Sequence, residues 1–262
     1  MSEPLSPIEI AKFAAAKRAA AFVEEGMQVG LGTGSTAAWL VKCLAERMKS
    51  EGLKFTGVPT STTTAELATE LGVPITTLDE ARWLDLTIDG ADEYDRELNL
   101  IKGGGGALLQ EKIVATASDR MIVITDATKK VETLGAFPLP VEVVPFGMNT
   151  TKRLLEEMLE GLEVMGNTGK FRVKGDQLFV TDEGNHIIDL HLGRIGNARQ
   201  LSLILNQVPG VVENGLFIDI CDVIVTGHGD GKVEVRDINS GESETTLVTS
   251  AQDDNVFLDI AD

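Results

Sequence analysis

The sequence is poor in cysteine and has no long apolar run. Its two cysteines, Cys43 and Cys221, lie far apart with no C-x-x-C motif, which argues against a disulfide framework and a cysteine-rich zinc site. No apolar run approaches the roughly 18 residues of a membrane-spanning helix. Residues 1–7 also lack the basic and apolar regions of a secretory signal. We therefore expect a globular protein of the reducing cytoplasm.

Basic residues are scarce as well. The 262 residues include 23 Lys and Arg against 41 Asp and Glu, so the formal net charge is −18. This charge repels phosphate backbones and anionic lipid headgroups, so neither nucleic acid nor a membrane is an expected partner. A phosphate ligand needs a local arrangement of backbone N–H groups and a few lysines that works against this field.

Predicted strands and helices alternate along the first half of the chain. The periodicity predicts helices over 8–25, 37–49 and 61–71, and strands over 27–31, 54–58, 75–78, 84–89 and 121–125. Such alternation implies parallel strands joined by crossover helices. The predicted fold class is therefore α/β, with a doubly wound, mostly parallel (Rossmann-like) sheet.

A change of composition near residue 135 predicts a second domain. Pro138, Pro140 and Pro145 interrupt a Val-rich run, which is typical of an edge strand or a linker. Short strands and helices follow, so we expect a smaller inserted α+β, ferredoxin-like domain over 134–209. The Rossmann-like domain is then formed by 1–133 and 210–235. Residues 236–262, with seven acidic side chains and one basic, form a predicted mobile or interacting acidic tail.

A glycine-rich turn follows the first predicted strand. In Gly-Leu-Gly-Thr-Gly-Ser-Thr (30–36), the glycines permit close backbone approach, and the next helix supplies N–H groups at its positive end. This pattern favours an anion cradle, although a tight turn without a ligand remains an alternative. The match to a dinucleotide G-x-G-x-x-A is weak by itself, and the Gly-Lys-Ser/Thr of nucleotide hydrolases is absent from the sequence.

Two carboxylates follow a later apolar strand. Asp89 ends that strand, and the turn Asp-Gly-Ala-Asp-Glu (89–93) can return Asp92 to the same edge. Carboxylates that share a pocket acquire different proton affinities, as acid and base partners require. Two alternatives stay open: an Asp-rich turn that caps the next element, and a divalent-ion site that recruits Asp95.

A run of four glycines precedes the candidate base. Lys102 is followed by Gly103–Gly106 and then by Glu111, which interrupts an apolar helical run. The glycines indicate a ligand against bare backbone, because their conformational entropy makes a plain spacer costly. Glu111 is a candidate general base of raised proton affinity, or else an exposed residue on the helix surface that pairs with Lys112 or another neighbour. Lys129, after another strand, is a further candidate anion ligand at the same sheet edge.

These segments together resemble the type A ribose-5-phosphate isomerases. The motifs are 30–37, Asp-Gly-Ala-Asp-Glu (89–93), Lys-Gly-Gly-Gly-Gly-Ala-Leu (102–108), Glu-Lys-Ile (111–113) and Asp-Ala-Thr-Lys (126–129), extended by 137–143 and 209–217. The resemblance covers about 8–231, in order. It implies interconversion of ribose 5-phosphate and ribulose 5-phosphate with no metal and no organic cofactor, in a cytoplasmic homo-oligomer, a dimer or a tetramer.

The resemblance also implies roles for individual residues. Glu111 is the base, Lys102 lies near the developing oxyanion, and Asp89 and Asp92 handle the sugar ring. The implied phosphate contacts are Thr33, Gly34, Ser35, Thr36 and Lys129, with Lys12 from the first helix, and the other implied sugar contacts are Gly90, Ala91, Gly103, Gly104 and Gly105. Leu109-Gln110 stands where a Thr-Arg pair is common in the family, and the acidic tail has no counterpart there.

Three other function classes share some of these features. A coenzyme A transferase uses a nucleophilic Glu in a Glu-Asn-Gly turn, which Glu213-Asn214-Gly215 matches. A non-catalytic sugar-phosphate sensor keeps the cradle without turnover, but the chain shows no added helix-turn-helix. A nicotinamide dehydrogenase needs an acidic residue after the second strand, where 59–64 instead supplies hydroxyls.

Overall fold

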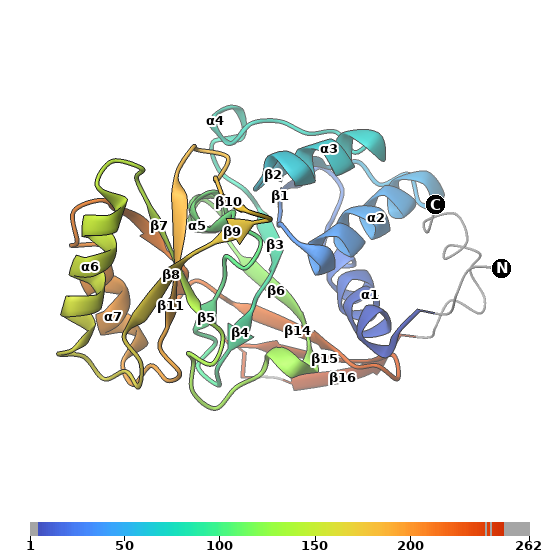
Figure 1. The fold of residues 1–262 in the computed structure, drawn as a ribbon. Helices are drawn as coiled ribbons and strands as arrows, with labels where there is room; N and C mark the ends of the chain where they lie inside the picture. The colour runs from blue at the N-terminus through green and yellow to red at the C-terminus, as the bar shows by residue number, and fades with distance from the viewer. Residues whose placement is uncertain (1–4, 239, 242, 249–262) are drawn as a thin grey trace. The chain divides into compact units, whose positions relative to one another are not determined.

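The structure is a computed structural model that describes residues 5–238, 240–241 and 243–248 (Figure 1). Internal contacts divide the chain into two compact units. Unit 1 consists of Met1–Gly90, Val114–Thr128 and Cys221–Asp262, and unit 2 consists of Ala91–Ile113 and Lys129–Ile220. The domain boundaries expected from the sequence, with an insert over 134–209, are a separate division of the chain and stay a prediction.

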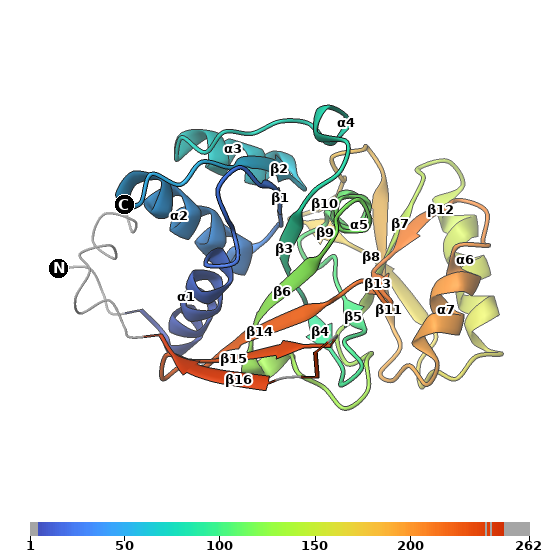
Figure 2. The same ribbon diagram turned by 180° about the vertical axis from the view of Figure 1, so that it is seen from behind.

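Unit 1 contains a seven-stranded sheet in the order β16-β15-β14-β6-β3-β1-β2. Its strands are β1 (Gln28–Leu31), β2 (Thr56–Pro59), β3 (Leu86–Gly90), β6 (Met121–Asp126), β14 (Val223–Gly227), β15 (Lys232–Asp237) and β16 (Ser243–Leu247). The strand pairs from β14 to β2 are parallel, and β15 and β16 extend the sheet through antiparallel pairs (Figure 2). The expected α/β class with a mostly parallel sheet is confirmed.

Helices cover this sheet on both faces. They are α1 (Pro7–Ala20), α2 (Ser35–Ser50), α3 (Thr62–Glu70) and α4 (Leu78–Ala81), with the end of α5 (Leu108–Thr116). Val29 and Leu31 pack in one cluster with the buried alanines of α1 and the leucines of α2. Gly30, between them, faces Val114 of α5 on the other side. This alternation along β1 is what a strand buried on both faces requires.

Unit 2 has a four-stranded antiparallel sheet in the order β12-β7-β11-β8. Its strands are β7 (Leu139–Val143), β8 (Thr168–Phe171), β11 (His186–His191) and β12 (Val211–Asn214), with helices α6 (Met148–Leu159) and α7 (Ala198–Leu205). The chain order βαββαβ is the ferredoxin-like arrangement. Two smaller sheets complete the unit: β9 (Val173–Lys174) with β10 (Gln177–Leu178), and β4 (Glu93–Tyr94), β5 (Leu100–Ile101) and β13 (Leu216–Phe217). The 3-10 turn η1 spans Ala127–Lys129.

The Pro-rich run 138–145 is not an edge or a linker, so that prediction was wrong. β7 lies between β12 and β11, in the interior of its sheet. Pro140 takes part through its carbonyl oxygen, which accepts a hydrogen bond from the Gly215 N–H at 2.8 Å. Proline has no backbone N–H, but its carbonyl oxygen can still accept a hydrogen bond within the sheet.

The acidic segment contains structure that the sequence did not predict. β16 pairs with β15 from Lys232↔Leu247 to Arg236↔Ser243. The remainder of the expected tail, 249–262 with 239 and 242, lies outside the described residues. The strand expected over 75–78 is reduced to a single bridge between Gly57 and Ile75.

Candidate active site

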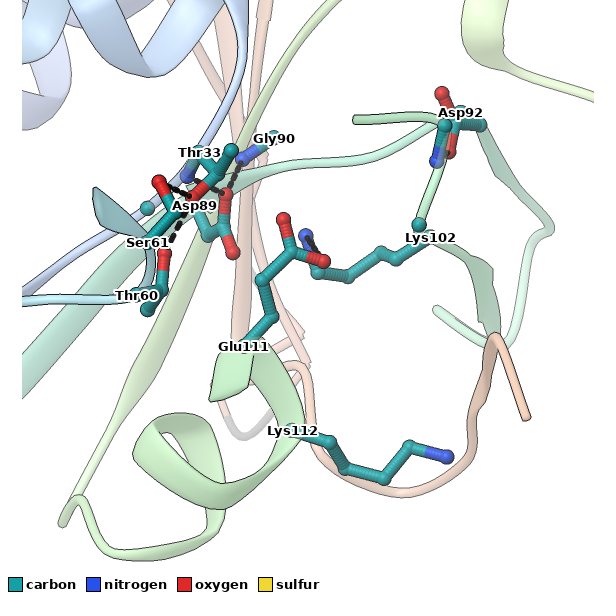
Figure 3. Close-up of polar contacts among 12 residues, drawn as sticks. Thr33, Thr60, Ser61, Asp89, Gly90, Asp92, Lys102, Glu111 and Lys112 are labelled. Carbon is teal, nitrogen blue, oxygen red and sulfur yellow. Dashed lines mark hydrogen bonds and ion pairs between the residues drawn. The ribbon is translucent and has the colours of Figure 1, made fainter. Parts of the chain in front are cut away.

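The turn after β1 is built around Asp89 in unit 1. Asp89 is the penultimate residue of β3, is fully buried, and accepts hydrogen bonds from the Thr33 N–H at 3.0 Å and the Gly90 N–H at 2.7 Å (Figure 3). A Cβ on Gly32 would lie 2.1 Å from the Asp89 Oδ1. Gly32 is therefore needed for close approach rather than for an unusual backbone angle. The Asp89 carboxylate is therefore packed directly against the backbone of the turn.

The Thr33 side chain points into a cluster of hydroxyls. Its Oγ1 lies 2.8 Å from Thr60 Oγ1, 2.8 Å from Ser61 Oγ and 3.4 Å from Thr64 Oγ1. Thr64 Oγ1 in turn donates to the Gly32 carbonyl at 2.9 Å. The hydroxyls after β2 thus hold the turn in place.

The beginning of α2 is open to a ligand. Its N-cap is Gly34, with φ of 105°, and no side chain caps it. By contrast, Ser6 caps α1 and Ser61 caps α3. Gly34 and Ser35 are exposed and Thr36 is half-buried. The N–H groups of the first turn of α2 and two hydroxyls therefore form a surface suited to an anion.

Lys12 is held near this helix terminus by a short chain of contacts. Its Nζ lies 2.7 Å from Glu9 Oε1, and Glu9 Oε2 accepts from the Trp39 Nε1 of α2 at 2.8 Å. Burial opposes ionisation of Glu9, but the donors Lys12 and Trp39 hold the pKa of this carboxyl below its ordinary value. Glu9 is therefore anionic at neutral pH and joins Lys12 of α1 to Trp39 of α2.

In unit 2, Lys102 and Glu111 form a buried pair. The Lys102 Nζ lies 3.4 Å from the Glu111 Oε2, and the two side chains are 2% and 3% exposed. Figure 3 shows their charged ends pointing toward each other. The Lys102 ammonium also lies 5.4 Å from the centre of the buried Phe217 ring. The alternative of a surface Glu111 paired with Lys112 is wrong.

The glycine run is shaped by contacts on both sides. Asp92 accepts a hydrogen bond from the Gly104 N–H at 2.8 Å. Gly103 and Gly106 have φ of 103° and 87°, values that favour glycine. A Cβ on Gly106 would lie 2.4 Å from the Phe179 ring. Nothing local in the sequence marks Phe179 as a neighbour of the glycines, and Phe217 appears there only as the last residue of the motif 209–217.

Lys112 and Glu213 form a separate, half-buried pair at 2.9 Å. Burial lowers the pKa of Lys112. Burial alone would raise the pKa of Glu213, but Lys112 and the hydrogen bonds from Asn214 and Asn206 hold it below its ordinary value. A Glu213 engaged in this way fits a structural role better than the nucleophile of a coenzyme A transferase.

The sequence-predicted residues fall into two groups. Unit 1 contains Lys12, Thr33, Gly34, Ser35, Thr36, Asp89 and Gly90, and unit 2 contains Ala91, Asp92, Lys102, Gly103, Gly104, Gly105, Glu111 and Lys129. Asp126, which ends β6, accepts from the Thr128 N–H at 2.9 Å, just before the half-buried Lys129. Within the described residues, no group of three or more His, Cys, Asp or Glu side chains is arranged to hold a metal ion.

Comparison with known proteins identifies the family. The family model of ribose 5-phosphate isomerase A (phosphoriboisomerase A) matches residues 56–231. A ribose-5-phosphate isomerase A of Ruegeria sp. (strain TM1040) is 69% identical over 262 residues, which are all of both chains. A solved D-ribose-5-phosphate isomerase in complex with phospho-erythronic acid is 39% identical, with a TM-score of 0.80 over 88% of this chain and 99% of that one. The structure of ribose 5-phosphate isomerase A from Methanocaldococcus jannaschii is 38% identical, with a TM-score of 0.77 over 90% and 97%. The chain belongs to the ribose 5-phosphate isomerase A family and is an isomerase.

Proposed function

We propose that this isomerase interconverts D-ribose 5-phosphate and D-ribulose 5-phosphate, with Glu111 as the general base. The observation that carries the proposal is the buried pair of Glu111 and Lys102 beside the glycine run. A carboxylate out of water is a stronger base toward carbon, and a neighbouring ammonium is placed to balance charge that develops on oxygen.

The proposed phosphate site is the first turn of α2. The N–H groups and hydroxyls of Gly34, Ser35 and Thr36 and the charge of Lys12 supply local attraction in a chain of net charge −18. Lys129 is a further proposed contact. Thr33 acts mainly through its turn, because its hydroxyl is engaged with Thr60 and Ser61.

The proposed chemistry is a proton transfer between neighbouring carbons. Asp89 and Asp92 assist ring opening as acid and base. Glu111 then removes the proton from C2, and the electron pair moves to give an enediolate with negative charge on O1. Lys102 and the N–H groups near Gly103–Gly105 stabilise that charge. Glu111 returns the proton to C1 while the O2 proton passes to O1, which leaves the carbonyl at C2.

The test of this role is Glu111→Gln. The amide keeps the shape of the side chain but cannot accept the C2 proton, so we expect kcat to fall by about 10²- to 10⁴-fold. Ribose 5-phosphate should still bind, as isothermal titration calorimetry would show. Glu213→Gln is the matched control, because it also removes a carboxylate paired with a lysine. Near-normal turnover of Glu111→Gln would exclude Glu111 from the mechanism.

Other expectations come from the sequence and from the resemblance. The independence from metal and organic cofactors, the homodimeric or homotetrameric state and the cytoplasmic location stay predictions. No helix of the described part of the chain is long and apolar enough to cross a membrane.

A further inference from the structure

Arg172 makes contacts that none of the proposed chemistry uses. It directly follows β8, and its side chain is 15% exposed. Its Nη1 donates to the carbonyl oxygens of Gly103 at 2.7 Å and Gly104 at 3.1 Å. Its Nε and Nη2 pair with the two carboxylate oxygens of Asp189 in β11, at 3.0 and 2.5 Å. One planar guanidinium thus joins the central sheet of unit 2 to the glycine run.

These contacts fix the direction of two peptide groups. In a trans peptide the C=O and the N–H point in opposite directions. When Arg172 holds the carbonyls of Gly103 and Gly104, the N–H groups of Gly104 and Gly105 must point away from it. The Gly104 N–H does so, and donates to Asp92 Oδ2 at 2.8 Å. The orientation of the next N–H, that of Gly105, follows from the same clamp.

An external clamp matters here because glycines do not hold a conformation by themselves. Gly104 and Gly105 are exposed, and glycine reaches more backbone states than any other residue. A cation on the carbonyl oxygens also polarises the peptide groups, which makes their N–H groups stronger donors. Donors that are oriented before charge develops are those that lower a reaction barrier.

We propose that Arg172, held by Asp189, is a positioning residue for the isomerisation. It orients the N–H groups of the glycine run and the carboxylate of Asp92 toward the enediolate, without touching the substrate. This inference rests on the proposed function, since it assumes that an enediolate forms beside this run. It predicts a defect in the transition state rather than in the binding of the phosphate.

The experiment compares Arg172→Met, Arg172→Lys and Arg172→Ala with the wild type and with Arg199→Met. Arg199 is the control, because it also pairs with an aspartate, Asp219, in an ion pair whose two side chains are exposed. We expect Arg172→Met to lower kcat about 10- to 100-fold with KM changed by less than about threefold, since losing one oxyanion donor outright costs about 10²- to 10³-fold. Arg172→Lys should be intermediate, because a lysine offers no planar fork.

Two further readouts separate positioning from a purely structural role. Affinity for erythronate 4-phosphate, whose planar carboxylate resembles the enediolate, should fall by the same factor as kcat/KM, while affinity for inorganic phosphate stays unchanged. Added ethylguanidinium should restore part of the kcat of Arg172→Ala. If that rescue fails and activity falls only in step with the melting temperature, Arg172 is structural and the proposal is wrong.

The result for Glu111→Gln keeps the two proposals apart. An inactive Glu111→Gln together with an Arg172→Met of wild-type kcat would overturn the role of Arg172 alone. A fully active Glu111→Gln would instead overturn the proposed mechanism on which that role depends. Should Arg172→Met fail to fold, Arg172→Lys and Asp189→Asn carry the same comparison, and wild-type kcat in both would also overturn the proposal.

Discussion

At the residue scale, Gly32 tests how closely the turn and the Asp89 carboxylate are packed. In Gly32→Ala the new Cβ would lie 2.1 Å from the Asp89 Oδ1 and 2.6 Å from the Asp89 Cα, so the carboxylate has to move. The bonds from Thr33 and Gly90 then weaken. We expect kcat/KM to fall at least about tenfold, and overpacking to destabilise the fold by about 1–3 kcal/mol, as measured by urea unfolding.

Gly161→Ala is the matched control for this substitution. Gly161 has no positive φ, and the nearest atom to its Cβ would be the Met158 carbonyl oxygen at 4.0 Å. Its activity and stability should stay close to wild type. Equal activity of the two variants would show that the Asp89 carboxylate tolerates displacement and is not needed where it lies.

The same scale shows what the sequence can and cannot predict about the site. The positions of Lys102 and Glu111 around a glycine run are enough to single out both residues. A run of glycines is costly to order, so it indicates a place where a ligand approaches the backbone. The buried pairing between them needed the fold. Arg172 and Phe179 were missed for a related reason: an ordinary Arg or Phe just after a short strand becomes informative only when tertiary packing brings it to the glycines.

At the element scale, we expect substitutions of two glutamates of unit 2 to change the pH dependence of stability in opposite directions. Burial raises the pKa of Glu142 in β7 despite hydrogen bonds from Asn185 and Thr181. Ionisation therefore costs more in the folded than in the unfolded chain, and the wild type loses stability as pH rises above the ordinary value of 4.5. Glu142→Gln removes this loss, and its Oε1 keeps both donors. We expect the variant to gain stability relative to wild type as pH rises from 4 to 7.

Glu156 in α6 is the control with the opposite sign. Burial would raise its pKa, but Lys152 and the Gly169 N–H donate to its carboxylate and hold the pKa below 4.5. The carboxylate therefore stabilises the fold above that value, and Glu156→Gln should lose stability relative to wild type as pH rises. Urea unfolding of the three proteins at low concentration measures both slopes. If the free energy of unfolding of both variants followed the same pH dependence as that of the wild type, the pKa directions given for Glu142 and Glu156 would be wrong.

Elements with strong local patterns were predicted best. The apolar strand β6, buried throughout, and the alternation of strands with helices follow from periodicity alone. β7 was misjudged because its prolines suggested an edge, whereas the strand uses the carbonyl of Pro140 for pairing. β16 was missed because Ser243–Leu247 is mostly exposed and polar. Backbone pairing with β15 holds this strand, and such pairing does not require a hydrophobic pattern in the sequence.

At the scale of the whole molecule, the net charge of −18 predicts a stability that depends on salt. Like charges repel within the compact state, and dissolved ions screen that repulsion as the Debye length falls to about 8 Å at 0.15 M. We expect the melting temperature to rise between 20 and 300 mM NaCl. The rise should be about 2–4 °C for each kcal/mol of repulsion that is screened.

Screening and specific ion binding give different results in this experiment. Screening depends on ionic strength, so NaCl, KCl and NaBr should raise the melting temperature equally, with most of the change below about 150 mM. Sulfate is left out of the comparison because an anion bound at the proposed phosphate site adds stability by mass action. A melting temperature that falls or stays level over this range would mean that pairs such as Arg153 with Glu157 outweigh the repulsion, because salt weakens exposed ion pairs as well.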